Sequence, residues 1–309
     1  MKHLQPVIIM VFLANLLSSC SEIVPFDEFR RTGGNRYIDL PSGTTNYELS
    51  GDPIGSHVVV LIHGGTIPLC IWEPQLAALR SAGFKILQYD QYGRGFSSRL
   101  KRPYSPDLYR EQLLELLDSL HLNAPVSLVG PSFGGAIAVS FAAAHPDRVR
   151  SMVLASPVLN LMNSSSPLVK PMTLLAKPVL GEIIYSLLLR RKIISRGRTL
   201  VPGGRKSSCD SSFIRQFTCK GTGHALLSQI RSGAYGDYRE ATRTVAADSL
   251  PVLLLRGKND TEVTEAMIGE VREDLPGCTF VEMENCGHGA SAENPELFNR
   301  LVIDFLLQH

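Results

Sequence analysis

Hydrophobic residues along most of this chain fall in short unbroken runs that alternate with amphipathic stretches. The run HVVVLIHGG from His57 is apolar, β-branched and closed by glycines, which predicts a strand buried on both faces of a parallel sheet. The stretch WEPQLAALRSAG from Trp72 has helical spacing and ends at a glycine, as helices often do. Strand-like and helix-like segments continue to alternate over residues 84–90, 105–122, 124–130, 133–144 and 149–157. This order predicts an α/β fold, with a mostly parallel central sheet and helices on both faces.

The alternation stops after Pro157. Residues 158–248 contain several Pro and Gly residues and mixed helical segments, without a clear strand pattern, and therefore predict a helical cap or lid insertion. The core is then expected in two parts, at residues 36–157 and 249–309. Residues 36–49 can supply an antiparallel hairpin ahead of the first parallel strand.

The N-terminus has the layout of an export signal. A basic start at Lys2, an apolar segment from Val7 to Leu17 and small residues after it predict a signal peptide over residues 1–19. The apolar segment is short for a membrane span. Leu-Ser-Ser before Cys20 resembles the bacterial lipoprotein box, which implies lipidation of Cys20 and a linker over residues 20–35. A plain signal peptide or an uncleaved anchor is the alternative.

This start predicts an exported protein of the cell envelope, anchored in a membrane and facing the periplasm or residing in the outer membrane. Ser21 follows Cys20, so the aspartate that commonly retains such proteins at the inner membrane is absent. The formal net charge of +2 is too small to argue for a nucleic-acid partner.

Cysteine spacing adds two expectations. Five cysteines follow Cys20, and an exported protein can form disulfides. Cys209 and Cys219 are close in sequence within one irregular region, so we expect them to pair. No spacing of cysteine and histidine residues resembles a metal site, and no metal or cofactor is expected.

The strand at residues 124–130 is followed by a motif that carries chemistry. Gly130-Pro131-Ser132-Phe133-Gly134 has the pattern G-x-S-x-G between a buried strand and a helix, which is the pattern of a nucleophile elbow. Such a turn holds the serine in a sparsely populated backbone conformation, and the glycines remove side chains that would collide. The hydroxyl then sits at a helix N-terminus, where backbone N–H groups favour developing negative charge. The alternative for Ser132 is an ordinary helix cap.

Together with this elbow, the chain resembles the α/β-hydrolase superfamily from about residue 36 to its end, apart from the insertion. His63-Gly64-Gly65 is similar to the family's oxyanion segment, and residues 89–99, YDQYGRGFSSR, are similar to its D-x-x-G-x-G-x-S loop. RGKND and NCGHGASAENPELF are similar to the loops that carry the acid and the histidine. Each match is weak alone, but their order and spacing together are specific.

A serine needs a base, and the base needs an orienting acid. In this fold the order is serine, acid, histidine. The strand that ends at Ala155 is followed by ASPVLN, without a carboxylate, so Asp260 after the next strand is the expected acid, with Glu262 second. His288, between two glycines after the last strand, is the expected base. His63 matches a structural histidine of the family, and the other histidines fit worse: His57, His121, His145, His224 and His309.

The oxyanion hole should combine the N–H of Phe133 with one from the turn after His63. Gly65 is favoured and Thr66 is close behind. The resemblance therefore implies a serine hydrolase that cleaves carboxylic esters through an acyl-enzyme, without metal or cofactor. Proline iminopeptidase, thioesterase and carbon–carbon bond hydrolase share the same triad, and a non-catalytic binding protein is a further alternative.

The expected substrate is a small-molecule ester, and the cap should select it. Residues 190–206, RRKIISRGRTLVPGGRK, are strongly basic and follow an apolar stretch, PVLGEIIYSLLL. A solvated cap helix explains this pattern, and so does a lid that admits lipid-like substrates or lies on an anionic membrane. Membrane contact is thus expected through a lipidated N-terminus and, as a second route, through this basic lid.

Overall fold

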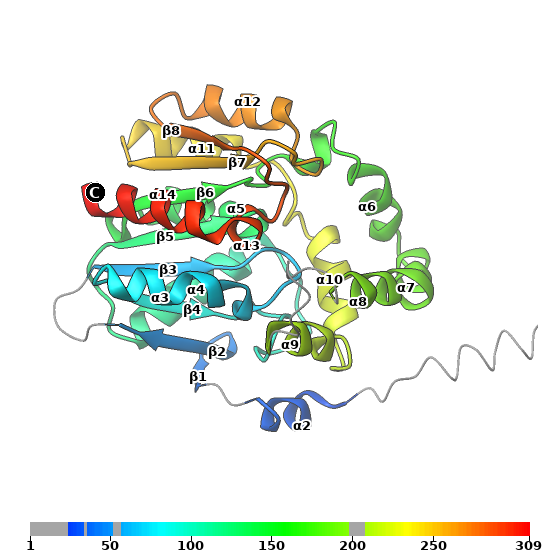
Figure 1. Cartoon of the computed structure of the whole chain (residues 1–309). Coiled ribbons are helices and arrows are strands. Elements are labelled where there is room, and N and C mark those ends of the chain that lie inside the picture. The colour runs from blue at the N-terminus through cyan, green and yellow to red at the C-terminus, as the bar shows by residue number, and fades with distance from the viewer. Residues whose placement is uncertain (1–23, 34–35, 52–56, 198–207) are drawn as a thin grey trace, which may run out of the picture.

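The computed structural model describes residues 24–33, 36–51, 57–197 and 208–309. Its centre is an eight-stranded sheet with the strand order β1-β2-β4-β3-β5-β6-β7-β8 (Figure 1). The strands are β1 (Arg36–Leu40), β2 (Gly43–Ser50), β3 (Val58–Ile62), β4 (Lys85–Tyr89), β5 (Val126–Pro131), β6 (Val149–Ala155), β7 (Val252–Gly257) and β8 (Thr279–Met283).

The strand directions confirm the predicted fold class. β1 and β2 form the antiparallel hairpin, β2 runs antiparallel to β4, and the remaining neighbours are all parallel. In a sheet of this kind the carboxyl ends of the parallel strands share one edge, and ligands bind there. The loops after β3, β5, β6, β7 and β8 are therefore brought together although they come from distant parts of the sequence.

Helices cover both faces of the sheet. On one face lie α4 (Pro106–Ser119), α5 (Phe133–Ala144), α11 (Arg239–Ala247) and α12 (Glu265–Asp274). On the other lie α3 (Glu73–Ser81) and α14 (Pro295–Gln308), with the short helix α13 (Ala290–Glu293) before α14.

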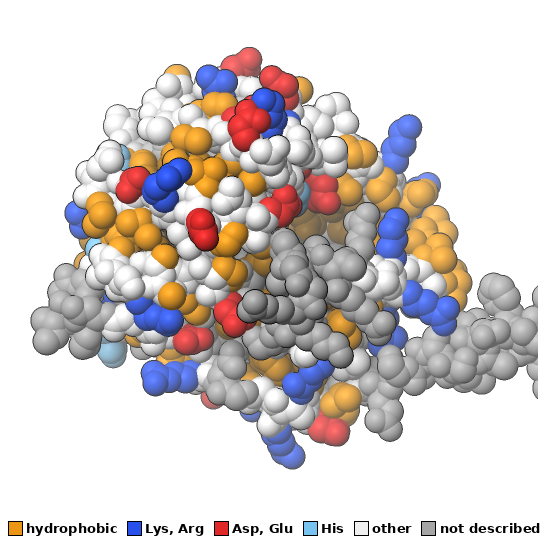
Figure 2. Space-filling model, in the orientation of Figure 1, with side chains coloured by type: hydrophobic (Ala, Val, Ile, Leu, Met, Phe, Trp, Pro, Cys, Tyr) orange, Lys and Arg blue, Asp and Glu red, His pale blue; other side chains and the backbone are white. Residues whose placement is uncertain are grey.

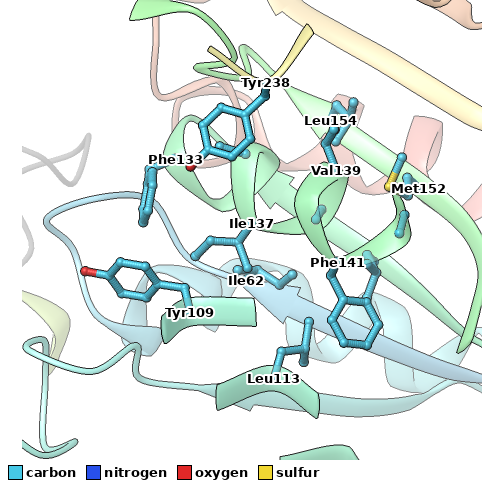
Figure 3. Close-up of a cluster of buried hydrophobic side chains, with 14 of the residues drawn as sticks. Ile62, Tyr109, Leu113, Phe133, Ile137, Val139, Phe141, Met152, Leu154 and Tyr238 are labelled. Carbon is cyan, nitrogen blue, oxygen red and sulfur yellow. The ribbon is translucent and has the colours of Figure 1, made fainter. Parts of the chain in front are cut away.

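Helix α5 is the centre of the first face. Its residues from Phe133 to Ala142 are all buried, and Figure 3 shows Phe133, Ile137 and Phe141 packed among side chains of the sheet and of α4. A helix that is apolar all round is held on every side by the core. The first turn of α5, directly after Ser132, is therefore fixed in place by packing.

A separate group of helices forms the cap. It contains α6 (Val169–Ala176), α7 (Leu180–Ile184), the π-helical segment η4 (Tyr185–Leu189), α8 (Arg190–Gly197), α9 (Ser208–Gln216) and α10 (Thr222–Arg231). These helices share a small core of their own, made of Leu175, Tyr185, Phe213, Phe217, Leu226 and Leu227.

The cap is shorter than the predicted insertion at residues 158–248. Helix α11 lies inside that range but packs on α5, and its Val245 is 1% exposed in the main core. The amphipathic pattern of α11 is that of a core-covering helix, and the sequence interpretation assigned it to the insertion because no strand separates it from the cap.

The predicted linker at residues 20–35 is partly folded. Helix α2 (Phe26–Arg31) buries Phe29, whose ring stacks on Phe96 with a centroid separation of 4.8 Å. Just before α2, Val24 N–H donates to the carbonyl of Thr218, and Lys220 N–H donates to the carbonyl of Val24, both at 2.9 Å. The described chain therefore begins against the cap. The predicted signal peptide and Cys20 lie outside the described residues.

Candidate active site

The turn between β5 and α5 has the geometry of a nucleophile elbow. Ser132 has φ 51° and ψ −122°, a conformation that an L-residue rarely adopts. A Cβ on Gly130 would collide with the backbone of Gly134, and a Cβ on Gly134 would collide with the carbonyl of Ile62. Both glycines of the motif are thus required by close backbone approach, and α5 begins directly after the serine.

His288 and Asp260 meet at the same edge of the sheet. His288 Nδ1 lies 2.8 Å from Asp260 Oδ2, which pairs the loops after β8 and β7. Asp260 is 4% exposed, and its Oδ1 accepts from the backbone N–H groups of Glu262 at 2.8 Å and Val263 at 3.0 Å. One oxygen is therefore fixed by the acid loop itself, and the other is left for the imidazole.

Burial and these contacts act in opposite directions on the two pKa values. Burial alone would raise the pKa of the Asp260 carboxyl, but the hydrogen bond and charge of His288, Val263 N–H and the Ser156 hydroxyl lower it. Burial alone would lower the pKa of His288, but the hydrogen bond and charge of Asp260, then Glu262 and Glu293, raise it. The pair thus favours an ionised acid beside an imidazole that readily accepts a proton.

Ser132 and His288 are not hydrogen-bonded to each other in this structure. Among the described residues the Ser132 hydroxyl makes no hydrogen bond, and His288 Nε2 lies 3.7 Å from a carboxylate oxygen of Glu262. Catalytic hydrogen bonds are often long before substrate binds. The contact between Ser132 and His288 remains a prediction.

The expected oxyanion segment lies against the elbow. A Cβ on Gly64 would stand 3.6 Å from the Ser132 Cβ, and one on Gly65 would stand 3.7 Å from the Phe133 Cβ. Within the described parts of the chain, the N–H groups of Gly65 and Thr66 have no acceptor. Phe133 N–H belongs to the first turn of α5, where no intrahelical acceptor exists. The N–H groups of Gly65, Thr66 and Phe133 thus have no acceptor assigned among the described residues, and their role as an oxyanion hole stays a prediction.

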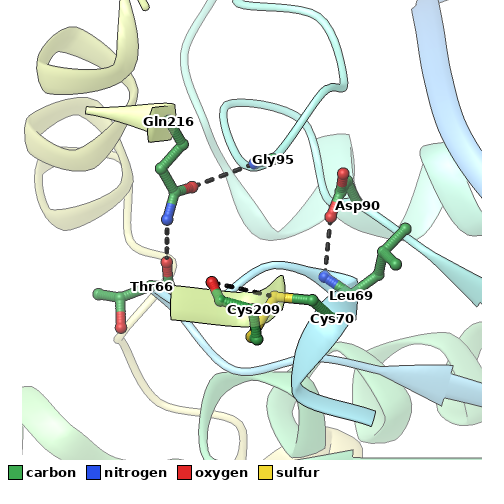
Figure 4. The surroundings of a disulfide bond; sticks show 7 residues. All are labelled: Thr66, Leu69, Cys70, Asp90, Gly95, Cys209 and Gln216. Atoms are coloured by element: carbon green, nitrogen blue, oxygen red, sulfur yellow. Dashed lines mark hydrogen bonds between the residues drawn. A yellow bond between two sulfur atoms is a disulfide. The ribbon is translucent and has the colours of Figure 1, made fainter. Parts of the chain in front are cut away.

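Two side chains that the sequence interpretation missed hold this segment. Arg94 Nε donates to the carbonyl of Gly65 at 2.6 Å. Gln216 Nε2 donates to the carbonyl of Thr66 at 2.8 Å, as Figure 4 shows. Gln216 Oε1 also accepts from Gly95 N–H at 3.1 Å. Arg94 lies in the D-x-x-G-x-G-x-S loop, so the motif could have pointed to it. Gln216 lies in the cap, where no local sequence motif marks it.

The predicted Cys209–Cys219 disulfide is wrong. Cys70 pairs with Cys209, with Cα atoms 5.0 Å apart, whereas Cys219 is free and buried (Figure 4). Cys209 is the second residue of α9, and the seven steps from it to the end of the helix at Gln216 rise about 10 Å at 1.5 Å each. The helix therefore carries the chain away from Cys209 before it reaches Cys219, although the two cysteines are close in sequence. The disulfide joins α9 to the short 3₁₀ helix at Leu69–Trp72, just after the oxyanion segment.

Two other polar residues near the site are structural. His63 Nδ1 donates to the carbonyl of Gly64 at 2.7 Å, its Nε2 accepts from Gln91 N–H at 3.0 Å, and burial lowers its pKa to about 4. Asp90 accepts from the backbone N–H groups of Leu69 and Phe96, both at 2.8 Å. Both residues have their hydrogen bonds occupied by the loops that they hold.

Glu293 supports the histidine loop, and the sequence interpretation missed it. Its carboxylate accepts from Gly287 N–H at 2.6 Å and from Gly289 N–H at 3.1 Å, on either side of His288. Ser156 follows β6, at the first of the two positions considered for the acid. Its hydroxyl bonds to Asp260 and so supports the acid at the second position.

No group of three or more His, Cys, Asp or Glu side chains suited to a metal ion occurs in the part of the chain that the structure describes.

Removing the charge of Glu262 should shift the pH profile. The base must be neutral, so kcat/KM falls as pH drops through the pKa of His288. The Glu262 carboxylate raises that pKa, so Glu262→Gln should move the acid limb to lower pH. A pH series of kcat/KM on a soluble ester measures this. Glu284→Gln, which removes an exposed partner of Lys258, is the matched control. An unmoved limb, or one moved to higher pH, would contradict the assigned geometry.

Comparison with known proteins places this arrangement. The profile of a hydrolase family described as "Serine aminopeptidase, S33" matches residues 55–295. A 2-hydroxy-6-oxononadienedioate/2-hydroxy-6-oxononatrienedioate hydrolase of Cupriavidus pinatubonensis is 24% identical over 89% of this chain and 96% of its own. A 2-(acetamidomethylene)succinate hydrolase of Mesorhizobium japonicum is 25% identical over 88% and 95%. The crystal structure of the enol-lactonase from Burkholderia xenovorans LB400 superposes with a TM-score of 0.69 and 25% identity, covering 88% and 100%.

Proposed function

This chain belongs to the α/β-hydrolase family described as serine aminopeptidase, S33, and we propose that it hydrolyses carboxylic esters through an acyl-enzyme formed on Ser132. The observation that carries the proposal is the strained Ser132 at the start of α5, at the sheet edge where His288 and Asp260 pair. A likeness to an enol-lactonase supports ester chemistry, since a lactone is a cyclic ester.

In the proposed reaction, Ser132 Oγ attacks the ester carbonyl while His288 Nε2 takes its proton. Asp260 keeps the proton on Nδ1, so that Nε2 stays free to act as the base. The N–H groups of Phe133 and of Gly65 or Thr66 stabilise the oxyanion. His288 then protonates the leaving alcohol, and water, activated by the same imidazole, releases the acid and restores the serine.

Carbon–carbon bond hydrolysis is the second candidate. A 2-hydroxy-6-oxononadienedioate contains two carboxylates, an enol and a ketone but no ester, so its hydrolase must break a bond between carbons. Arg94 favours an anionic substrate of this type. It is 1% exposed, and its guanidinium bonds to the neutral oxygens of Gly65, Gly93 and Gln229. No carboxylate is bonded to this guanidinium among the described residues, although the buried carboxylate of Asp90 lies in the same loop against Gly95.

A matched substrate panel separates the two candidates. p-Nitrophenyl esters of increasing chain length and a simple enol lactone test the first, and 2-hydroxy-6-oxononadienedioate tests the second. We expect turnover of esters, with kcat/KM highest for one chain length. If no ester is turned over and the dienedioate is consumed rapidly, the second proposal replaces the first. Proline p-nitroanilide and a thioester complete the panel, since those substrates use the same triad.

We also propose that the protein works at the cell envelope, tethered through Cys20. The support is the sequence of residues 1–20, which lie outside the described residues. Expression of the full chain in a double-membraned bacterium should place it in the membrane fraction, and Cys20→Ala should release it into the soluble fraction once the signal is cleaved. Identical fractionation of both forms would contradict the tether. Cys278→Ala, at a free cysteine away from the N-terminus, controls for loss of a thiol.

A further inference from the structure

Exposed aliphatic side chains are concentrated on one stretch of the cap. Of the six large hydrophobic residues that the structure describes as exposed, five lie between α6 and η4, and the sixth, Leu307, is near the C-terminus. Figure 2 shows hydrophobic side chains gathered at the right of the molecule, where Figure 1 places α6 and α7. We call these five residues the cap apolar surface: Leu174 (46% exposed), Val179 (71%), Leu180 (39%), Ile183 (49%) and Leu188 (66%).

The inner side of the same helices is apolar as well. Leu175 and Tyr185, which alternate with the exposed residues, are buried in the core of the cap. A helix that is apolar on both sides needs an apolar environment on both sides. The cap core supplies the inner one, and nothing in the described chain covers the outer one.

Exposed cations flank this surface along the chain. Lys170, Lys177, Arg191 and Lys192 are exposed and have no ion-pair partner among the described residues. The sole carboxylate in the sequence from 168 to 197 is Glu182, which is bonded to Arg231 at 2.6 Å and 3.0 Å. Figure 2 shows Lys and Arg side chains beside the hydrophobic ones. Exposed aliphatic side chains flanked by cations without an ion-pair partner complement a bilayer that carries anionic headgroups.

Helix lengths favour a docked cap over a spanning one. No single helix in the described ranges is long and apolar enough to cross a membrane, and only α6 taken together with Leu180–Ser195 reaches that composition, with a bend of 118° between them. Short apolar helices joined by a sharp bend can lie in the interface plane with one face immersed.

The start of the described chain lies on the cap. Val24 exchanges backbone hydrogen bonds with Thr218 and Lys220, just after α9. Cys20 precedes Val24 by four residues, which reach at most about 14 Å. A lipid on Cys20 would therefore hold the cap, and not the far side of the molecule, near the membrane.

We propose that the cap apolar surface docks on an anionic lipid bilayer. Its aliphatic side chains enter the boundary between headgroups and acyl chains, and Lys177, Arg191 and Lys192 contact the phosphates. Arg190, in contrast, bonds to the carbonyl of Phe217 at 3.0 Å within the cap and is left out of the contact. Docking requires no turnover, so this proposal goes beyond the hydrolase activity and can fail while that activity holds.

A tryptophan reporter tests the docking directly. The chain has one tryptophan, Trp72, which is 0% exposed. We would prepare the full chain as L188W and as the matched control L307W, which alters an exposed leucine on α14 (65% exposed). Each is mixed with vesicles of equal parts phosphatidylglycerol and phosphatidylcholine, with and without brominated acyl chains. Brominated lipid should quench the added emission of L188W at least twofold and leave that of L307W and the parent protein unchanged.

Charge variants test the anionic partner. In the L188W background, replacing Lys177, Arg191 and Lys192 with Gln should weaken docking roughly fivefold per cation and reduce its dependence on salt. L174W should be quenched like L188W, which guards against a local artefact at one position.

Three results would overturn the proposal. Equal quenching of L188W and L307W, or none of either, would remove the surface from contact with lipid. Equal docking on pure phosphatidylcholine would remove the role of the cations. Blue-shifted emission of L188W without vesicles, with a dimer in size-exclusion chromatography, would show that a second copy of the chain covers the surface.

Discussion

Ser132→Ala should lower kcat for ester hydrolysis by about 10⁶-fold, the largest effect that we expect of any single change. The hydroxyl is the atom that forms the acyl-enzyme, and no neighbouring group can replace it at the elbow. Because the backbone N–H groups at Gly65, Thr66 and Phe133 remain, a residual rate above that of water should persist. The strained backbone of residue 132 is set by Gly130 and Gly134, so the fold should survive.

Two measurements check this prediction. A fluorophosphonate should add one adduct to the parent protein, located on Ser132 by peptide mass spectrometry, and none to Ser132→Ala. Ser140→Ala, a substitution in the same helix, is the matched control and should keep both the labelling and the rate. An adduct that persists without Ser132 would remove this residue from the nucleophile position.

The triad should also behave as one unit. Ser132→Ala and His288→Ala made together should cost about as much as either alone, since the base has no function without its nucleophile. If the rate losses of the two single variants instead multiplied in the double variant, His288 would act separately from Ser132. That outcome would count against the link that the structure leaves open, because Ser132 and His288 are not hydrogen-bonded here.

The fold was open to prediction because local patterns and global topology agree along the core. Buried β-branched runs formed the parallel strands, and the run from residue 133 to 144 formed α5 within the predicted bounds. The loops after parallel strands meet at one edge whatever their separation in sequence. For this reason an ordered set of short motifs was enough to predict that His288 and Asp260 lie side by side.

The contacts that could not be predicted from the sequence are those that depend on how the cap packs on the core. The bond between Cys70 and Cys209 joins residues 139 positions apart, and Gln216 contacts Thr66 from a cap helix. No periodicity within either segment encodes such contacts. The same holds for α2, whose Phe29 is buried by Phe96 and Cys219 and not by its own neighbours. The predictions from sequence therefore fail mainly at the contacts that the cap and the N-terminal segment make with the core.

Asp260→Asn should lower kcat by about 10⁴-fold and leave the fold intact. Asparagine keeps the shape and can still accept the backbone N–H groups of Glu262 and Val263. It cannot compensate the imidazolium that forms during the reaction. Its amide can also hold His288 in the tautomer that carries the proton on Nε2, where the imidazole no longer acts as a base toward Ser132.

The measurement is kcat on a soluble ester, with thermal unfolding recorded for the same samples. Glu262→Gln is the matched control because that carboxylate lies 3.7 Å from Nε2, on the other nitrogen of the same ring. If Asp260 is the orienting acid, the control keeps most of its activity at neutral pH. Near wild-type turnover of Asp260→Asn would contradict the assignment, and a collapse of Glu262→Gln in the same assay would transfer the role to Glu262. The two contacts of His288 make these outcomes separable, since Asp260 meets Nδ1 at 2.8 Å and Glu262 meets Nε2.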